Sequence, residues 1–148
     1  MAIKINGNTV ITDTYTVQSL GNKTTYLANT AGKVLTSDGV WSAQGEVTLV
    51  DAAVIALDMS TGINFTVTLG GNRFLDNPTN TKIGQRGRIR VKQDGTGGRT
   101  LGYGTAWLFP GGEAHVLEGS APGEFDLLYY DVLDTKIVLS ALGNVSSP

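Results

Sequence analysis

The chain contains no cysteine, so neither a disulfide framework nor a thiolate metal site can hold its fold together. It has a single histidine, which excludes a metal site built from several histidines. Charged residues make up only 16% of the chain, the formal net charge is -2 at pH 7 and the sequence pI is about 5.2. The composition provides no basic footprint for nucleic acid and no polybasic membrane patch, so we expect neither partner.

Long apolar runs are also missing. No stretch approaches the ~20 apolar residues that cross a bilayer, and the first residues lack the apolar core of a secretory signal. We therefore expect synthesis and folding in a cytoplasm. No long helical periodicity occurs, while 20 glycines stand against four prolines. This pattern predicts an all-β protein of many short strands joined by turns.

The central stretch, residues 84–112, carries the clearest local signals. Polar and apolar residues alternate over 88–92, which places Ile89 and Val91 on one face of a half-buried strand and the cations on the other. The glycine-rich segment 94–98 then predicts a tight chain reversal. Large apolar residues follow, and we expect them to nucleate a β core: Leu101, Tyr103, Trp107, Leu108 and Phe109.

Residues 46–148 are predicted to form one domain, an antiparallel β-sandwich of jelly-roll type with eight or nine strands. The segment 64–69 alternates cleanly, with apolar residues expected to face inward. A further short strand is expected at 114–117. The last two strands are expected over 125–133 and 136–142.

Residues 1–45 are predicted to form an extended arm that is too poor in apolar residues to build a core alone. Asn6-Gly7 predicts a short hairpin near the start, and Asp38-Gly39 predicts a second one. We expect the arm to dock on a partner or on copies of the chain; the alternative is docking onto the chain's own C-terminal domain. The residues expected to anchor it are Ile3, Ile5, Val10, Ile11 and Tyr15.

The strand expected over 125–133 is apolar on both faces. Such a strand is either covered on both sides within a sandwich or lies at a subunit interface. A domain of this size rarely has a third layer, which favours the interface. The residues expected at an oligomer interface are Phe125, Leu127, Leu128, Tyr129, Tyr130 and Val132.

Catalytic chemistry has little support in the sequence. His115 would have to serve any Ser-His-Asp triad, and a structural or solvent-facing role is favoured. The segment 94–98 lacks the Gly-Lys-Ser/Thr ending of a phosphate-binding loop, so a nucleotide site is rejected. We expect no catalytic residue, no cofactor and no metal. Six carboxylates are of the type that forms a glycosidase pair or binds calcium, and we interpret them as solvated side chains: Glu113, Glu118, Glu124, Asp126, Asp131 and Asp134.

Arg99, Tyr103 and Trp107 are candidate contacts to a glycan. An aromatic face stacks on a pyranose ring, and arginine donates hydrogen bonds to hydroxyls or carboxylates. Aromatic residues after a glycine-rich turn more often fill a core, and burial is the favoured interpretation.

Several phrases of the chain resemble virion structural proteins of tailed bacteriophages. The opening MAIKINGNTVITD resembles the N-terminus common in tail-fibre proteins, and AGKVLTSDG (31–39), followed by Trp41, is similar to a linker phrase that recurs in phage fibres. Five segments resemble a β domain seen in such proteins: NFTVTLGGN (64–72), NPTN (77–80), GQRGRIRVKQDGTGGRTLGYG (84–104), WLFPGG (107–112) and DLLYYDV (126–132).

This resemblance implies a non-enzymatic virion structural protein on the particle surface that assembles as an oligomer, commonly a trimer. The chain has no long repetitive shaft, which favours a short capsid-decoration subunit, such as a cement, knob or spike protein. Its partner would be the major capsid protein or a tail or baseplate protein. Two alternatives stay open: a short tail-fibre or receptor-binding module for a host glycan, and a small glycan depolymerase.

Overall fold

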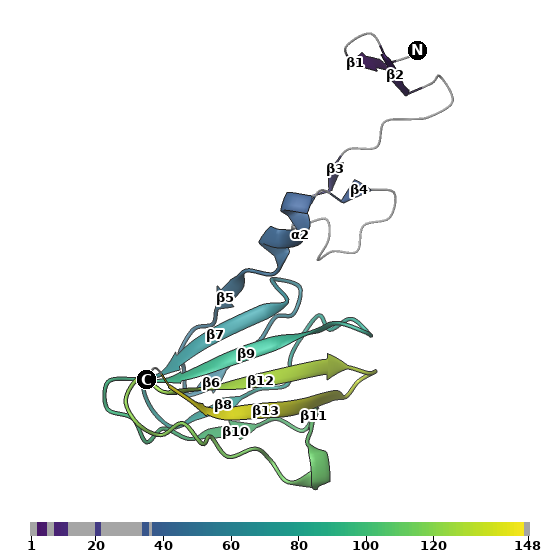
Figure 1. Ribbon diagram of the computed structural model, residues 1–148. Coiled ribbons are helices and arrows are strands. Elements are labelled where there is room, and N and C mark those ends of the chain that lie inside the picture. The colour runs from purple at the N-terminus through teal and green to yellow at the C-terminus, as the bar shows by residue number, and fades with distance from the viewer. Residues whose placement is uncertain (1–2, 6–7, 12–19, 22–33, 36, 147–148) are drawn as a thin grey trace.

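The computed structural model describes residues 3–5, 8–11, 20–21, 34–35 and 37–146. Between residues 46 and 146, which are described without a gap, the chain forms two β-sheets that lie face to face (Figure 1). The large sheet has six strands in the order β11 (Trp107–Leu108), β13 (Ile137–Val145), β12 (Phe125–Val132), β9 (Arg86–Gln93), β7 (Asn64–Leu69) and β5 (Glu46–Thr48). The small sheet has three, in the order β10 (Leu101–Tyr103), β8 (Arg73–Leu75) and β6 (Val54–Ile55).

The chain alternates between the two sheets from β5 to β10. Strands β5, β7 and β9 pair in parallel in the large sheet, and β6, β8 and β10 pair in parallel in the small one. Residues 46–103 therefore form three rungs of a flattened coil, and each rung contributes one strand to each sheet. Equivalent residues stack from rung to rung, as Val47, Phe65 and Ile89 do in the large sheet.

A C-terminal hairpin closes the large sheet beyond the coil. Strands β12 and β13 pair antiparallel, β12 also pairs antiparallel with β9, and the short β11 pairs in parallel with β13. A 3-10 turn, η1 (Pro110–Gly112), follows β11. The predicted hairpin and the predicted eight or nine strands are confirmed, since nine strands lie between residues 46 and 146.

The expectation of an antiparallel jelly roll is not met, because the large sheet is mixed and the small sheet is parallel. Alternation of polar and apolar residues identifies the buried face of a strand but not its neighbour or its direction. The turns at 70–72 and 94–100 carry the chain into the opposite sheet instead of back beside the preceding strand. The coarser prediction of a mostly β fold is confirmed.

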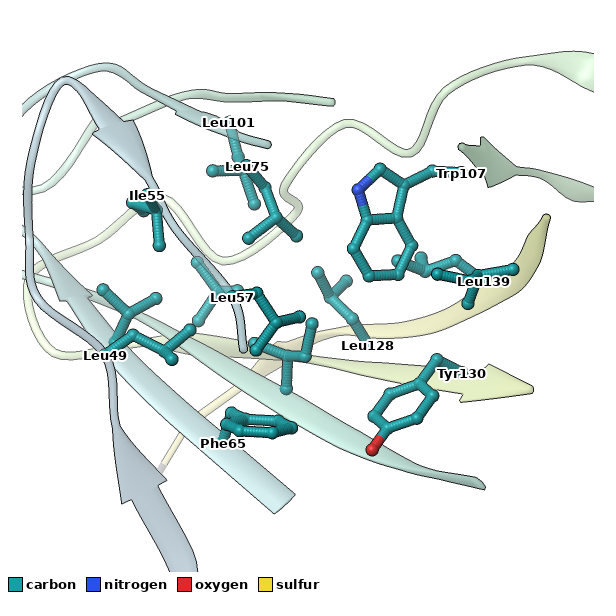
Figure 2. Packing of buried hydrophobic residues seen from close by; sticks show 14 of the residues in the cluster. Leu49, Ile55, Leu57, Phe65, Leu75, Leu101, Trp107, Leu128, Tyr130 and Leu139 are labelled. Carbon is teal, nitrogen blue, oxygen red and sulfur yellow. The ribbon is translucent and has the colours of Figure 1, made fainter. Parts of the chain in front are cut away.

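The hydrophobic core fills the space between the sheets, where the labelled side chains converge (Figure 2). Phe65, Ile89 and Leu128 of the large sheet meet Ile55 and Leu75 of the small one, and each is at most 1% exposed. Full burial of such a side chain stabilises the fold by about 1.5–3 kcal/mol. The predicted inward faces of the strands at 64–69 and 88–92 are confirmed.

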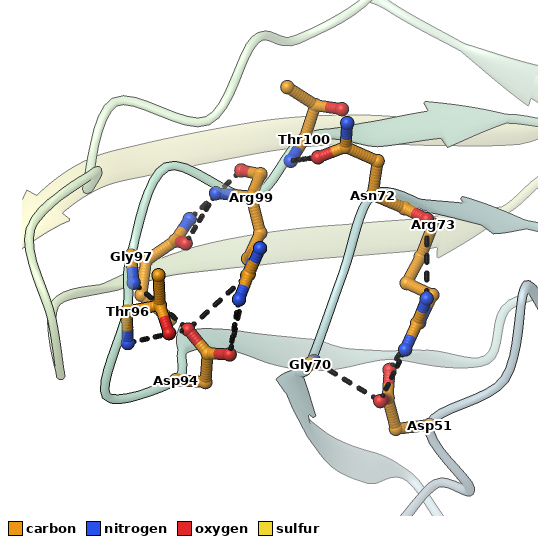
Figure 3. Close-up of polar contacts among 10 residues, drawn as sticks. Asp51, Gly70, Asn72, Arg73, Asp94, Thr96, Gly97, Arg99 and Thr100 are labelled. Atoms are coloured by element: carbon orange, nitrogen blue, oxygen red, sulfur yellow. Dashed lines mark hydrogen bonds and ion pairs between the residues drawn. The ribbon is translucent and has the colours of Figure 1, made fainter.

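Polar side chains tie successive rungs together where the chain crosses between sheets (Figure 3). The Asp51 carboxylate accepts hydrogen bonds from the Arg73 Nε (2.7 Å) and from the Gly70 backbone N–H (3.1 Å). Asn72 Oδ1 accepts one from the Thr100 N–H (3.1 Å), which links the second rung to the third. The Arg73 guanidinium holds the pKa of Asp51 below its usual value.

The predicted reversal at 94–98 is present, and Asp94 organises it. Asp94 Oδ1 accepts hydrogen bonds from the N–H groups of Thr96 and Gly97, both at 2.9 Å, while Oδ2 pairs with Arg99 Nη2 at 2.8 Å. These donors, Arg99 foremost, lower the pKa of Asp94 to about 2. Gly97 and Gly98 both have positive φ angles, which explains the glycines.

The N-terminal hairpin is confirmed, because β1 (Ile3–Ile5) pairs antiparallel with β2 (Asn8–Ile11). Strand β3 (Leu20–Gly21) pairs in parallel with β4 (Val34–Leu35). These are the only strands in the described residues before 37.

The second predicted hairpin, at Asp38-Gly39, is wrong: residues Ser37–Ala43 form the helix α2, so the arm is not extended throughout. The strand that precedes this turn, β4, pairs in parallel with β3 and not with residues 40–42. Instead Ser42 Oγ donates to the Gly39 carbonyl (3.2 Å), and Ala43 is fully buried.

The strand expected at 114–117 is also wrong, because no strand lies between η1 and β12. The nearby N–H groups of Glu118 and Gly119 donate to the Asp126 carboxylate rather than to a neighbouring strand.

Candidate functional site

The outer face of the large sheet, which points away from the core, carries charged, polar and apolar side chains. Its residues form rows because the strands are in register. One row consists of Glu46, Asn64, Arg88, Tyr129 and Ser140. The next consists of Thr48, Thr66, Arg90, Leu127 and Leu142. The two halves of this face differ: β7 contributes Asn and Thr, whereas β12 contributes mainly apolar residues.

Strand β9 contributes a column of cations along the middle of this face: Arg86, Arg88, Arg90 and Lys92. Arg86 Nε pairs with Asp131 at 2.8 Å. Glu46 serves both Arg88, whose Nη2 lies 3.4 Å away, and Arg90, whose Nη2 lies 2.6 Å away. Three arginines thus share two carboxylates, and Lys92 adds a further positive charge to a chain that is negative as a whole.

The predicted oligomer-interface residues divide between the two faces of β12. Leu128, Tyr130 and Val132 are at most 3% exposed in the core, so they cannot touch a partner without disrupting the fold. Phe125, Leu127 and Tyr129 point to the outer face. Together with residues of β13 they leave an apolar patch, defined here as Phe125, Leu127, Leu142 and Val145. Leu142 is 54% exposed.

A pocket of about 580 Å³ lies at the other end of the same strands, where β9 begins and β12 nears its end. Its lining includes Gln44, Asn64, Arg86, Arg88, Tyr129 and Tyr130. Tyr130 Oη donates to the Ile63 carbonyl (2.6 Å), and burial raises the pKa of this phenol. Gly87 leaves the space that this arrangement needs, because a Cβ there would collide with the Ile63 carbonyl and lie 2.8 Å from Tyr130 Oη.

The candidate glycan contacts lie in the corner and the core of the domain. Arg99 pairs with Asp94. Tyr103 is half-buried, and its ring forms a T-shaped pair with the ring of Phe109 at a centroid distance of 4.9 Å. Trp107 is 4% exposed, and its Nε1 donates to the Asp76 carbonyl (3.1 Å), so its indole offers no open face to a ligand.

The proposed anchoring residues lie near the N-terminus. Ile3 and Ile5 belong to β1, and Val10 and Ile11 belong to β2. Tyr15 lies outside the described residues.

His115 has a structural partner. Its Nε2 lies 2.7 Å from Oδ2 of Asp126, whose side chain is 1% exposed. The same carboxylate accepts hydrogen bonds from the N–H groups of Glu118 (2.9 Å), Gly119 (2.8 Å) and Asn144 (3.1 Å). Asp126 therefore ties the irregular segment after η1 to the sheet.

The other acidic side chains considered for catalysis are dispersed. Asp131 pairs with Arg86, and Glu124 Oε2 accepts a hydrogen bond from the Ala121 N–H (2.8 Å). The remaining three are exposed: Glu113, Glu118 and Asp134. In the part of the chain that the structure describes, no group of three or more His, Asp or Glu residues could hold a metal ion. That same part contains no helix long and apolar enough to span a membrane.

The chain matches no protein-family model, no curated protein and no solved structure. The site is therefore interpreted from its own geometry.

Sequence reasoning missed the pocket, although it placed cations on one face of β9. Arg88 and Asn64 are neighbours only because β7 and β9 pair in parallel, and Tyr129 joins them through the antiparallel pairing of β12. The available signal was the alternation itself, which identifies the outward residues of each strand. Combining them into one site requires the strand order, which alternation does not contain.

Proposed function

We propose that the protein is a non-enzymatic structural component of a tailed-phage particle, a capsid-decoration protein of the cement, knob or spike kind. Its β domain, from residue 46 onward, assembles with copies of itself as a trimer. Its N-terminal residues, 1–45, attach it to the major capsid protein or to a tail protein. The resemblance of the phrases at 64–72, 84–104 and 126–132 to phage β domains supports the virion role.

The observation that carries the assembly proposal is the apolar patch. A sheet face that meets only water is normally polar, as the Asn and Thr residues of β7 are on this face. Phe125, Leu127 and Leu142 depart from that rule on β12 and β13, while the opposite side of these two strands already packs into the core. Apolar residues grouped on an outer sheet face favour a protein contact.

Assembly through this patch gives the N-terminal arms a function that one copy lacks. Three copies carry three arms, so that binding of one arm raises the effective concentration of the other two at the particle surface. Modest individual affinities then combine into durable attachment.

Light scattering on the full chain tests the assembly. We expect a mass of about three times the 15.6 kDa of one copy. Leu142→Asp, which places a charge in the patch, is expected to give the monomer mass. Val116→Asp is the matched control, because Val116 is an exposed aliphatic residue (77%) in the segment between η1 and β12, and this variant should remain trimeric. A monomeric wild-type protein would overturn the trimer.

Immunogold labelling of purified particles tests the location. We expect label over the head surface. Label confined to the tail would show that the partner is a tail or baseplate protein and not the major capsid protein. Particles without label would refute the virion role.

A further inference from the structure

We propose that the pocket at the start of β9 binds an acidic saccharide through the carboxylate of one sugar residue. The inference rests on the pocket alone and does not depend on the virion role or on the trimer. The pocket includes Tyr129, whereas the apolar patch begins at Leu127 and continues toward the start of β12, so the two share no residue.

The size of the pocket fits a sugar. Its volume of about 580 Å³ falls within the range of roughly 300–1,000 Å³ that is typical of small-molecule sites. Its floor is held in place, because the Tyr130 hydroxyl donates to the Ile63 carbonyl, and a side chain at Gly87 would collide with that carbonyl. A floor held in this way loses little conformational entropy when a ligand binds.

The charge of the pocket favours a carboxylate. Arg86 and Arg88 both line it, and their side chains are 75% and 44% exposed. Each guanidinium has five N–H donors, whereas the structure uses the Nε of Arg86 for Asp131 and the Nη2 of Arg88 for a long contact to Glu46. Because Glu46 lies closer to Arg90, Arg88 is the less compensated of the two arginines that Glu46 serves. A planar carboxylate matches the free edge of a guanidinium.

The rest of the lining suits the hydroxyls and the ring of a sugar. Tyr129 is 43% exposed and supplies an aromatic wall for the apolar face of a pyranose. Asn64 is fixed beside it, since its Nδ2 donates to the Gln44 carbonyl (2.7 Å) and its Oδ1 accepts from the Arg88 N–H (3.2 Å). The exposed Gln44 side chain adds an amide at the rim. Amides and guanidiniums next to an aromatic ring recognise a carboxylated sugar better than they recognise an acidic peptide, which would not use the ring.

Isothermal titration calorimetry on the full chain tests the proposal with oligomers of galacturonate, glucuronate and N-acetylneuraminate. We expect at least one of the three to bind. Its methyl-esterified form, which keeps the sugar and removes the charge, is expected to bind at least tenfold more weakly. An esterified form that binds equally well would overturn the role of the carboxylate, and failure of all three acidic oligomers to bind would overturn the site.

The variant Arg88→Gln is expected to weaken binding about ten- to a hundredfold, the effect of losing a hydrogen bond to a charged group. Lys92→Gln is the matched control, because Lys92 belongs to the same cation column of β9, loses the same charge and lies outside the pocket. Equal losses in both variants would indicate diffuse attraction and overturn the pocket. Polyglutamate is tested in the same way. If it binds as tightly as the sugar acid and loses as much affinity in Arg88→Gln, the ligand is an acidic peptide and the saccharide proposal is overturned.

Two measurements on the same samples keep this result separate from the assembly and from the fold. The urea midpoint should show that Arg88→Gln is folded, since its ion pair is exposed. Light scattering should give the same mass for wild type and variant. A loss of binding that is accompanied by loss of fold or of mass would contradict a direct role of Arg88 in the pocket.

Discussion

Alternating residues of the same strands form the two faces of the large sheet. The chain itself covers one of these faces much more fully than the other. On β9, Ile89 is fully buried while its neighbour Arg88 is an exposed cation. On β12, Leu128 is fully buried while its neighbour Leu127 is a half-buried apolar residue on the outer face. The inner face is completed by the small sheet, whereas the outer face carries apolar and cationic groups that are only partly covered.

This difference separates residues that maintain the fold from residues available for contacts. A side chain on the inner face has its partners within one copy, so its loss should lower stability whatever else is present. A side chain on the outer face should matter when a second molecule binds. Alternating positions on one strand can therefore be compared directly.

The largest contrast is expected between Leu128→Ala and Leu127→Ala. Leu128 is 0% exposed, so its truncation leaves a cavity and should lower the free energy of unfolding by about 2–5 kcal/mol. Leu127→Ala should cost about 1 kcal/mol or less at low protein concentration. Urea unfolding at several protein concentrations measures both, and the cost of Leu127→Ala should grow with concentration, because the proposed assembly would stabilise the wild-type chain more than the variant. Equal, concentration-independent losses would erase the distinction between the faces.

The second contrast concerns carboxylates on the two faces of β12. Asp126→Asn turns an acceptor that faces several donors into a group that itself donates, and we expect a loss of about 1–3 kcal/mol for each buried donor left unpaired. Asp131→Asn removes only the exposed pair with Arg86 and should cost about 1 kcal/mol or less. Thermal or urea unfolding of both variants decides the point. A larger effect for Asp131→Asn would contradict the structural role assigned to Asp126.

The smallest effect is expected at the corner between the sheets, which belongs to neither face. The pKa of Asp94 is lowered to about 2 in the folded protein, mainly by Arg99, so its carboxylate stabilises the fold above pH of about 4 and this stabilisation is lost as the pH falls toward 2. The urea midpoint of Asp94→Asn should therefore lie below that of the wild type at pH 5, and the gap should close near pH 2. Asp134→Asn, at the exposed end of the β12–β13 hairpin, is the control and should show no such closure. A gap that is constant with pH would show that the ion pair does not stabilise the corner.

The sequence predicts the strands that have one apolar and one polar face. It does not predict which strands pair when they lie far apart along the chain. The strand at 64–69, the inward positions of Ile89 and Val91 and the final hairpin follow from local alternation and turn residues. The parallel coil does not, because the distance along the chain between β7 and β9 leaves no local signal of their pairing. The pocket was missed for the same reason.

Two local errors have a different origin. Asp38-Gly39 has the composition of a hairpin turn, but the preceding strand β4 pairs with β3, and helix α2 forms after it. Residues 114–117 have the apolar content of a strand, yet the backbone that follows them finds its hydrogen-bond acceptor in one buried side chain, Asp126. In both places, hydrogen bonds to another segment of the chain outweighed the local sequence pattern.

The coil also sets how the length of this domain can vary. Each rung adds one strand to the large sheet and one strand to the small sheet. The junction between any two rungs therefore offers one strand edge in each sheet. An additional unit of about 20 residues, the short end of the range for stacked repeats, would find one strand edge in each sheet if it were inserted after β8, but it would separate the Tyr130 hydroxyl from the Ile63 carbonyl. Such an insertion would move the two ends of the domain apart by one strand spacing, about 4.8 Å, which makes the height of the domain adjustable in fixed steps.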